Sequence, residues 1–213
     1  MSSAVTRPLN VCLAAFTAAL VGFTAASATA ADWPTFRGTG RTAVAPDTNL
    51  LEAWPQSGPP LVWETAAGAG RGYASPAIVG DRIFTLGDGL STAEDKDEYL
   101  TCFDRKTGKQ LWKTKTGQPW TDGQPTWQSS RSTPTIDGDT VYVLSPFGLL
   151  VACDVATGRE KFRVDLKQEF GGKKADSWGY SESVTIDGDV LVCTPGGEQA
   201  TMVALDKRTG KKI

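Results

Sequence analysis

The sequence predicts an all-β fold of repeated four-stranded antiparallel units, and three landmarks that recur in the same order carry this prediction. A D-x-x-T-G pattern begins at Asp104, Asp154 and Asp206, at intervals of 50 and 52 residues. A Gly-Asp pair precedes each copy, at residues 80–81, 138–139 and 188–189. Further upstream lie the short runs SPAIV, TPTID and SVTID, which begin at residues 75, 133 and 183. Ordered recurrence at a nearly constant period indicates internal structural repeats.

The first two strands of each unit are expected to form a hairpin. In the second unit the apolar runs 135–137 and 140–144 are separated by Gly138 and Asp139. A two-residue connection of this kind is typical of a tight hairpin, and the pair Asp137-Gly138 suits the type I′ turn. The first and third units repeat the arrangement.

The third strand of each unit is expected to enter the D-x-x-T-G turn, and the fourth strand to leave it. The runs YLTCFD and LLVACD lead into the turn, and QLWKTKT and EKFRVDL follow it. The aspartate can cap the reversal through nearby backbone groups, and the glycine can adopt a positive φ. Four antiparallel strands in a unit of about forty to fifty residues are typical of a β-propeller blade.

A longer form of the turn, A-x-D-x-x-T-G-x-x-x-W, resembles the tryptophan-docking repeat of the PQQ-like (quinoprotein-type) β-propellers. Residues 102–112 match with Cys102 in the alanine position, and residues 152–162 match with Phe162 in the tryptophan position. Residues 204–210 match as far as the glycine. The resemblance implies an eight-bladed disc in which each docking aromatic packs between neighbouring blades. It also implies kinship with exported outer-membrane assembly factors and PQQ-dependent dehydrogenases.

These patterns divide the chain into a leader, an arm and part of a propeller. We expect a signal peptide over residues 1–30, an N-terminal arm over 31–58 and a partial propeller over 59–213. Within the propeller we expect a closure strand at 59–68 with Trp63 in the docking position, and blades at about 71–118, 119–168 and 169–213. The last blade stops before its docking aromatic, so we expect an N-terminal fragment of about three blades.

The leader has the three parts of an export signal. Arg7 lies in a short polar lead, residues 11–26 are an apolar core, and Ala28-Thr29-Ala30 forms an A-x-A cleavage site. Cleavage after Ala30 would leave a periplasmic or secreted protein that does not span the membrane. The alternative is a membrane anchor, but the apolar run is short for a spanning helix.

Composition excludes several kinds of chemistry. The sequence contains no histidine, so this stretch holds no His-dependent triad and no imidazole base. The formal net charge is −2 and the basic residues are scattered, which argues against nucleic acid as a partner. Cys102, Cys153 and Cys193 lie in apolar alternating runs, so we expect three buried thiols; the alternative is one disulfide and one free thiol.

The candidate site lies in two long connections before the second and third blades, residues 118–131 and 169–182. They hold the cofactor-binding candidates Arg131, Trp127, Trp178, Tyr180 and Glu182. Pyrroloquinoline quinone (PQQ) is a planar tricarboxylate, so its site would need aromatic faces, cationic donors and calcium held by oxygen ligands. The alternative is that these side chains pack the connections between blades. No metal site and no catalytic residue is predicted, because Asp137-Gly138-Asp139 and Asp187-Gly188-Asp189 are typical of hairpin turns.

Two classes of function remain open. The first is an exported binding or scaffold module of the cell envelope whose partners are other envelope proteins. The second is a PQQ-dependent dehydrogenase that oxidises an alcohol or sugar. The vicinal disulfide, catalytic aspartate and calcium ligands that the resemblance implies for such dehydrogenases match no residues here, so the scaffold is favoured and no cofactor is assigned.

Overall fold

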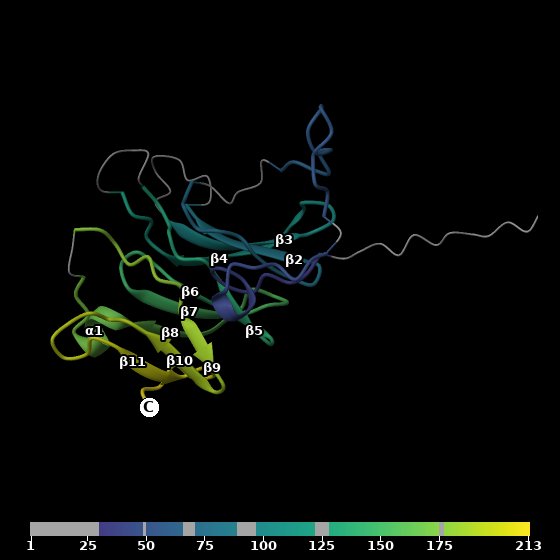
Figure 1. Ribbon diagram of the computed structural model, residues 1–213. Helices are drawn as coiled ribbons and strands as arrows, with labels where there is room; N and C mark the ends of the chain where they lie inside the picture. Colours follow the sequence, from purple (N-terminus) through teal and green to yellow (C-terminus); the bar gives the residue numbers. More distant parts are fainter. Residues whose placement is uncertain (1–29, 49, 66–70, 89–96, 122–127, 175–176) are drawn as a thin grey trace, which may run out of the picture.

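The computed structural model describes residues 30–213 except residues 49, 66–70, 89–96, 122–127 and 175–176 (Figure 1). The signal-peptide prediction therefore falls almost wholly outside the described residues. Strands form three antiparallel sheets with the orders β1-β2-β3-β4, β5-β6-β7-β8 and β9-β10-β11. Figure 1 shows the sheets one beside the next, in the order of the chain. The predicted all-β propeller architecture is confirmed.

Each sheet is formed by consecutive strands of one repeat. The first comprises β1 (Ala77–Val79), β2 (Arg82–Gly87), β3 (Glu98–Asp104) and β4 (Gln110–Gly117). The second comprises β5 (Thr135–Asp137), β6 (Thr140–Leu144), β7 (Leu149–Asp154) and β8 (Glu160–Asp165). The third comprises β9 (Thr185–Asp187), β10 (Val190–Cys193) and β11 (Val203–Asp206). A 3-10 helix, η1 (Thr39–Arg41), precedes the sheets, and α1 (Leu166–Phe170) follows β8.

The hydrophobic core lies between the sheets. One buried cluster joins the first and second sheets and includes Phe84, Leu100 and Val143. A second cluster joins the second and third sheets and includes Leu150 and Leu191. Alternate residues of each strand face the neighbouring sheet, so burial of these side chains holds the sheets side by side.

The three predicted core thiols are confirmed. Cys102, Cys153 and Cys193 are free and buried, one in each sheet. Burial raises the pKa of Cys153 and Cys193 to about 12, which keeps both thiols protonated and unreactive at neutral pH.

Each D-x-x-T-G turn is held by the same hydrogen bonds. In the second sheet Asp154 Oδ1 accepts from the backbone N–H groups of Ala156 (3.1 Å) and Thr157 (2.9 Å), and from the Thr157 hydroxyl (2.7 Å). These bonds hold the pKa of Asp154 below its usual value. Gly158 closes the turn at φ 74°, where a side chain would be strained. Asp104 and Asp206 make the equivalent bonds in the other two turns.

The docking aromatics pack on the glycine of the next turn along the chain. A Cβ added at Gly158 would lie 2.6 Å from the Trp112 ring, and the Trp112 indole N–H donates to the Val155 carbonyl at 3.2 Å. Phe162 covers Gly210 in the same way. The predicted position of both aromatics between blades is confirmed, although both are half-buried rather than fully buried.

Trp63 also docks, but the predicted closure strand around it does not appear. The Trp63 ring covers Gly108, and its indole N–H donates to the Arg105 carbonyl at 2.8 Å. Residues 61–65 nevertheless form no strand, and Leu61 and Val62 are 76% and 81% exposed. Leu61 and Val62 thus lie outside the sheets and are exposed. This segment does not pair with β11.

The N-terminal arm runs beside the first strand of each sheet. Trp33 and Ile78 exchange backbone hydrogen bonds of 2.7 and 2.9 Å, which adds one bridge to the free side of β1. The Pro34 carbonyl then accepts from the Ile136 N–H in β5 at 2.8 Å. One short segment therefore satisfies backbone groups in two different sheets.

The arm continues to the third sheet. The Arg41 guanidinium donates to the carbonyls of Ser183 (2.8 Å) and Val184 (2.5 Å), immediately before β9. In Figure 1 the purple η1 accordingly lies near β5 and β9. The arm thus connects the inner edges of all three sheets, a role that the sequence did not predict. Among the described residues no helix is long and apolar enough to cross a membrane.

Candidate functional site

The alternation of antiparallel strands gives the molecule two unlike faces. The Gly-Asp hairpins and the D-x-x-T-G turns connect strands at one end of every sheet, which we call the turn face. The connections β2–β3, β4–β5, β6–β7 and β8–β9 lie at the opposite end, which we call the loop face. Binding residues are found mostly on loops that a rigid scaffold positions, so the longer loop-face connections are the first place to search.

Two aromatic rings from different connections meet on the loop face. Trp120 lies in the β4–β5 connection and Phe147 in the β6–β7 turn, with ring centroids 5.4 Å apart and planes inclined by 35°. Gly148, at φ 92°, ends the β6–β7 turn beneath Tyr180. The sequence Pro146-Phe147-Gly148 thus places an aromatic side chain at the tip of a short turn.

Lysines from the α1 region surround these rings. The short helix is capped by the Asp165 carboxylate, which accepts from the N–H groups of Lys167 and Gln168, and its Leu166 and Phe170 side chains are buried. Lys167 therefore points outward, and its Nζ lies 5.6 Å from the centroid of the Phe147 ring. Ammonium groups over aromatic faces are attracted by the ring quadrupole.

The rings and lysines enclose a cleft of about 400 Å³, which we call the loop-face cleft. It is lined by Trp120, Pro146, Phe147, Lys167, Gly172, Lys173, Lys174, Ser177, Trp178 and Gly179. The described lining combines aromatic surface with three cationic side chains and includes no carboxylate. A cleft of this size and composition suits an anionic ligand that also carries an apolar or aromatic group.

Arg131 extends the cationic surface beside the cleft. Its guanidinium lies 5.0 Å from the Trp178 ring centroid and 6.0 Å from that of Tyr73. Trp178 is 41% exposed and Tyr73 is 55% exposed, so both rings are accessible on this face. Of the predicted site residues, the structure brings together Arg131 and Trp178.

The other predicted site residues are placed differently. The Tyr180 hydroxyl is buried and donates to the Pro195 carbonyl at 2.7 Å. The Glu182 carboxylate accepts hydrogen bonds from the Thr194 N–H (2.8 Å) and the Thr194 hydroxyl. Both side chains are therefore engaged within the third blade. Trp127 lies outside the described residues.

A quinone–calcium site requires more than the loop face supplies. Arg131, Trp178 and the lysines offer cationic donors and aromatic faces for a planar carboxylate. However, the described residues contain no group of three or more acidic, cysteine or histidine side chains that could hold a metal ion. The fit to PQQ with calcium is therefore partial, and no cofactor is assigned.

A buried carboxylic acid lies at the loop-face end of the first blade. Glu98 begins β3 and is fully buried; it accepts from the Ser130 hydroxyl at 2.5 Å and from the Thr116 hydroxyl at 2.8 Å. Burial raises its pKa to about 7, against the lowering effect of the two hydroxyl groups. Ser130 belongs to the connection that enters the second blade, so Glu98 links two blades. No motif or spacing in the sequence indicated this buried carboxyl group.

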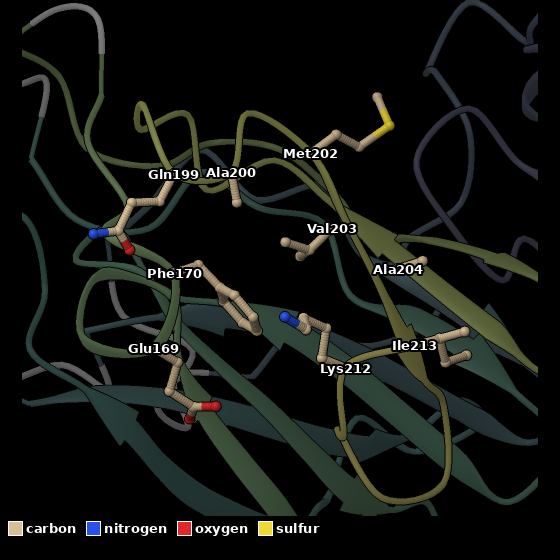
Figure 2. A pocket seen from close by; sticks show the side chains of 9 residues that line it. All are labelled: Glu169, Phe170, Gln199, Ala200, Met202, Val203, Ala204, Lys212 and Ile213. Carbon is tan, nitrogen blue, oxygen red and sulfur yellow. The ribbon is translucent and has the colours of Figure 1, made fainter.

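Two further hollows serve the packing of blades. Figure 2 shows one of about 500 Å³ between α1 and β11, where Phe170 and Lys212 extend into the same space. It lies on the side of β11 where the first two sheets carry a fourth strand. The other, about 430 Å³ on the turn face, is lined by charges that already pair, since Lys161 contacts Asp139 at 2.8 Å and Lys207 contacts Asp137 at 2.6 Å.

The sequence analysis missed the part of the loop-face cleft that lies outside the two long connections, namely Pro146, Phe147 and Lys167. Phe147 and Lys167 lie in separate strand connections, and nothing in their spacing indicates that they meet. One local signal was present: the tip Pro146-Phe147-Gly148 exposes an apolar residue in a turn, where polar residues are usual.

Sheets of consecutive strands, with aromatics docked on the turns of the next sheet, define a β-propeller of the tryptophan-docking class. Two solved structures, both of dehydrogenases, agree with this fold. The quinohemoprotein alcohol dehydrogenase from Comamonas testosteroni is 20% identical with a TM-score of 0.59, covering 85% of this chain and 26% of its own. A europium-containing methanol dehydrogenase is 16% identical with a TM-score of 0.50, and the match covers 72% of this chain and 26% of that protein. BamB from Moraxella catarrhalis is 23% identical with a TM-score of 0.48, and the match covers 71% of this chain and 41% of that protein. The chain thus spans less than half of each of these proteins.

The family is shown by sequence. A family model described as "Outer membrane protein assembly factor BamB" matches residues 22–119 and 96–213. The chain therefore belongs to this family of PQQ-like propeller repeats. No curated protein matches the sequence closely enough to add to this result.

Proposed function

We propose that this chain is an exported binding module of the cell envelope that engages other proteins through its loop face. The observation that carries the proposal is the loop-face cleft, which combines the exposed Trp178 ring and the half-buried Trp120 and Phe147 rings with lysines. Aromatic side chains of this kind are enriched in protein interfaces, and lysines gathered in a concave surface attract acidic partners. The family description as an outer membrane protein assembly factor supports a role in the envelope.

The turn face makes a poor binding surface by comparison. Its backbone groups are used in the turns, as where the Val155 N–H donates to the Asp139 carbonyl at 2.9 Å. Its described charges are largely paired, as in Arg208–Asp189 at 2.8 Å. Functional contacts are therefore expected at the opposite end of the blades.

Site-specific photo-crosslinking in the envelope tests this proposal. A photoreactive phenylalanine at position 147 should crosslink the full chain to an envelope protein. The matched control places the same group at Lys106, which is 75% exposed on the turn face and should give no crosslink. Equal crosslinking from both positions, or none from position 147, would contradict the proposed loop-face function.

The alternative is a PQQ-dependent dehydrogenase that oxidises an alcohol or sugar. The contact between Arg131 and Trp178 is the observation in its favour, because it offers a cation and an aromatic face. The test is dye reduction by the full chain with added PQQ and Ca²⁺. Activity that disappears in Arg131→Ala and in Trp178→Ala would establish the enzyme over the binding module.

A further inference from the structure

We infer that the loop-face cleft binds an acidic peptide segment that carries an aromatic side chain among its carboxylates. This inference rests on the proposed function and specifies the chemistry of the partner. It depends on the charge, the aromatic surface and the free polar group of the cleft.

The charge of the cleft opposes that of the whole protein. The chain has a formal net charge of −2, yet the described lining of the cleft, which leaves out residues 175–176, holds Lys167, Lys173 and Lys174 and no acidic residue. In the described part of the chain, none of these three lysines takes part in an ion pair. Concentrated positive charge in a concave surface raises the local concentration of anionic ligands.

The aromatic surface selects a ligand that is not purely anionic. Trp120 and Phe147 form a tilted pair, and Trp178 adds a ring at the margin of the cleft. Such rings are suited to offset stacking against another aromatic side chain. A small inorganic anion would pair with the lysines but would not contact these rings. A ligand that carries both negative charge and an aromatic group is therefore the better match.

One hydrogen-bond donor in the cleft lining is unused. The Trp120 indole N–H is buried and has no acceptor among the atoms that the structure describes. Buried indole groups usually find a partner. A peptide carbonyl or carboxylate oxygen would accept this bond once the Trp120 ring turns its N–H toward the cleft, because the N–H is closed to solvent in the structure.

A peptide fits these features better than an acidic sugar or a phosphate. The lysines are separate point charges on flexible stems, spread over residues 167–174, which suits carboxylates at several positions along an extended chain. Phosphate groups are typically held by arginine forks or converging backbone N–H groups. Lys167 over Phe147 instead places a carboxylate partner next to an aromatic partner.

Fluorescence anisotropy with labelled peptides tests the inference on the full chain. The probe is a short glutamate-rich peptide with one tryptophan, and two controls replace its glutamates by lysines or its tryptophan by alanine. We expect binding of the first peptide alone, weakening as sodium chloride rises from about 50 to about 300 mM. Equal binding of either control peptide, or no binding of the probe, would overturn the inference.

Matched variants locate the binding. Lys167→Gln with Lys174→Gln should weaken the probe about fivefold or more, whereas Lys106→Gln with Lys109→Gln changes the charge equally on the turn face and should leave affinity unchanged. Trp120→Phe keeps the ring but removes the donor, and should weaken the probe about fivefold. An unchanged affinity in the cleft variant, with thermal unfolding as a check of its fold, counts against this site.

Two comparisons separate this inference from the proposed function. If polygalacturonate displaces the probe more effectively than polyglutamate, the occupant is an acidic glycan and the peptide assignment is wrong. If position 147 crosslinks an envelope protein while the acidic probe does not bind, the partner chemistry is wrong and the binding role stands. If the probe binds without any crosslink in the envelope, the envelope role fails instead.

Discussion

The turn face and the loop face of this propeller obey different rules, although the same strands build both. On the turn face Asp104, Asp154 and Asp206 make the same hydrogen bonds three times, and an aromatic covers the glycine of each turn. On the loop face the connections differ in length, and side chains from distant positions meet in one cleft. Repetition therefore marks the part of the chain that maintains the fold, and departure from repetition marks the part that is free to bind.

The two faces also treat carboxylates in opposite ways. Exposed hydrogen-bond donors hold the pKa of Asp154 below its usual value on the turn face. Burial raises the pKa of Glu98 to about 7 at the loop-face end of β3. Lowering the pH should therefore destabilise the turn face, and raising the pH should destabilise the loop-face end of β3.

Truncation of a docking aromatic should have the largest effect. Trp112→Ala removes a ring that covers Gly158 and lies 5.9 Å from the Phe84 centroid. We expect a loss of about 3–5 kcal/mol in the free energy of unfolding, toward the lower end because Trp112 is half-buried. Urea denaturation measures the loss. The loop-face control Trp178→Ala should cost about 1 kcal/mol or less, and equal losses would remove the distinction between the faces.

Replacement of Glu98 should change how stability depends on pH. The folded state holds the Glu98 proton more tightly than the unfolded chain, because the pKa rises from 4.5 to about 7. The stability that this group contributes is present below pH 4.5 and is lost as the pH rises to about 7. The whole change is on the order of 3 kcal/mol.

Glu98→Gln keeps the shape and cannot titrate, so its free energy of unfolding should vary less between about pH 5 and about pH 8 than that of the unsubstituted protein. Denaturation at several pH values provides the measurement. Parallel pH profiles for the two proteins would show that Glu98 does not carry a raised pKa.

Two glycine substitutions isolate the docking contact from backbone strain. Gly158 and Gly138 both have a positive φ, at 74° and 57°. A Cβ at Gly158 would lie 2.6 Å from the Trp112 ring, whereas a Cβ at Gly138 would meet nothing within 4 Å. Gly138→Ala should cost about 1–2 kcal/mol from the left-handed backbone alone, and Gly158→Ala about 2 kcal/mol more. Similar losses in thermal unfolding would mean that the ring moves aside without cost.

The turn carboxylates should give the smallest effect, which appears only in acid. Because their pKa values are lowered in the folded state from 3.8, their contribution is present above that value and is lost as the pH falls below it. Asp154→Asn keeps an acceptor for the Thr157 N–H but cannot be protonated. Its stability should fall less steeply in acid than that of the unsubstituted protein, as followed by circular dichroism, and an unaltered acid transition would contradict this.

The sequence was sufficient to predict the turn face because every contact there is local or repeated. The bonds of Asp104 to Thr107 span three residues, and Trp112 reaches Val155 only by entering the next copy of the repeat. Spacing alone therefore identified the turns, the docking positions and the family. Residues 61–65, inside the predicted closure strand 59–68, form no strand in the structure, and closure by this segment stays a prediction.

The loop face could be predicted only in part. Arg131 and Trp178 were expected to lie near each other and do, at 5.0 Å. Tyr180 was expected on the same surface, but its hydroxyl turns to the Pro195 carbonyl in the interior. Glu98 and the lysines of the cleft depend on which connections approach in space, and no periodicity encodes that.

The arm that joins the inner edges of the blades also constrains how the protein folds. Blade hairpins close over a few residues, but Arg41 finds its acceptors 142 and 143 residues further along the chain. Such a contact carries a large loop-closure cost, and contacts of high sequence separation slow folding. We therefore expect the blades to form first and the N-terminal arm to bind to them last. Refolding should then end with a slow phase, and Arg41→Ala should abolish that phase.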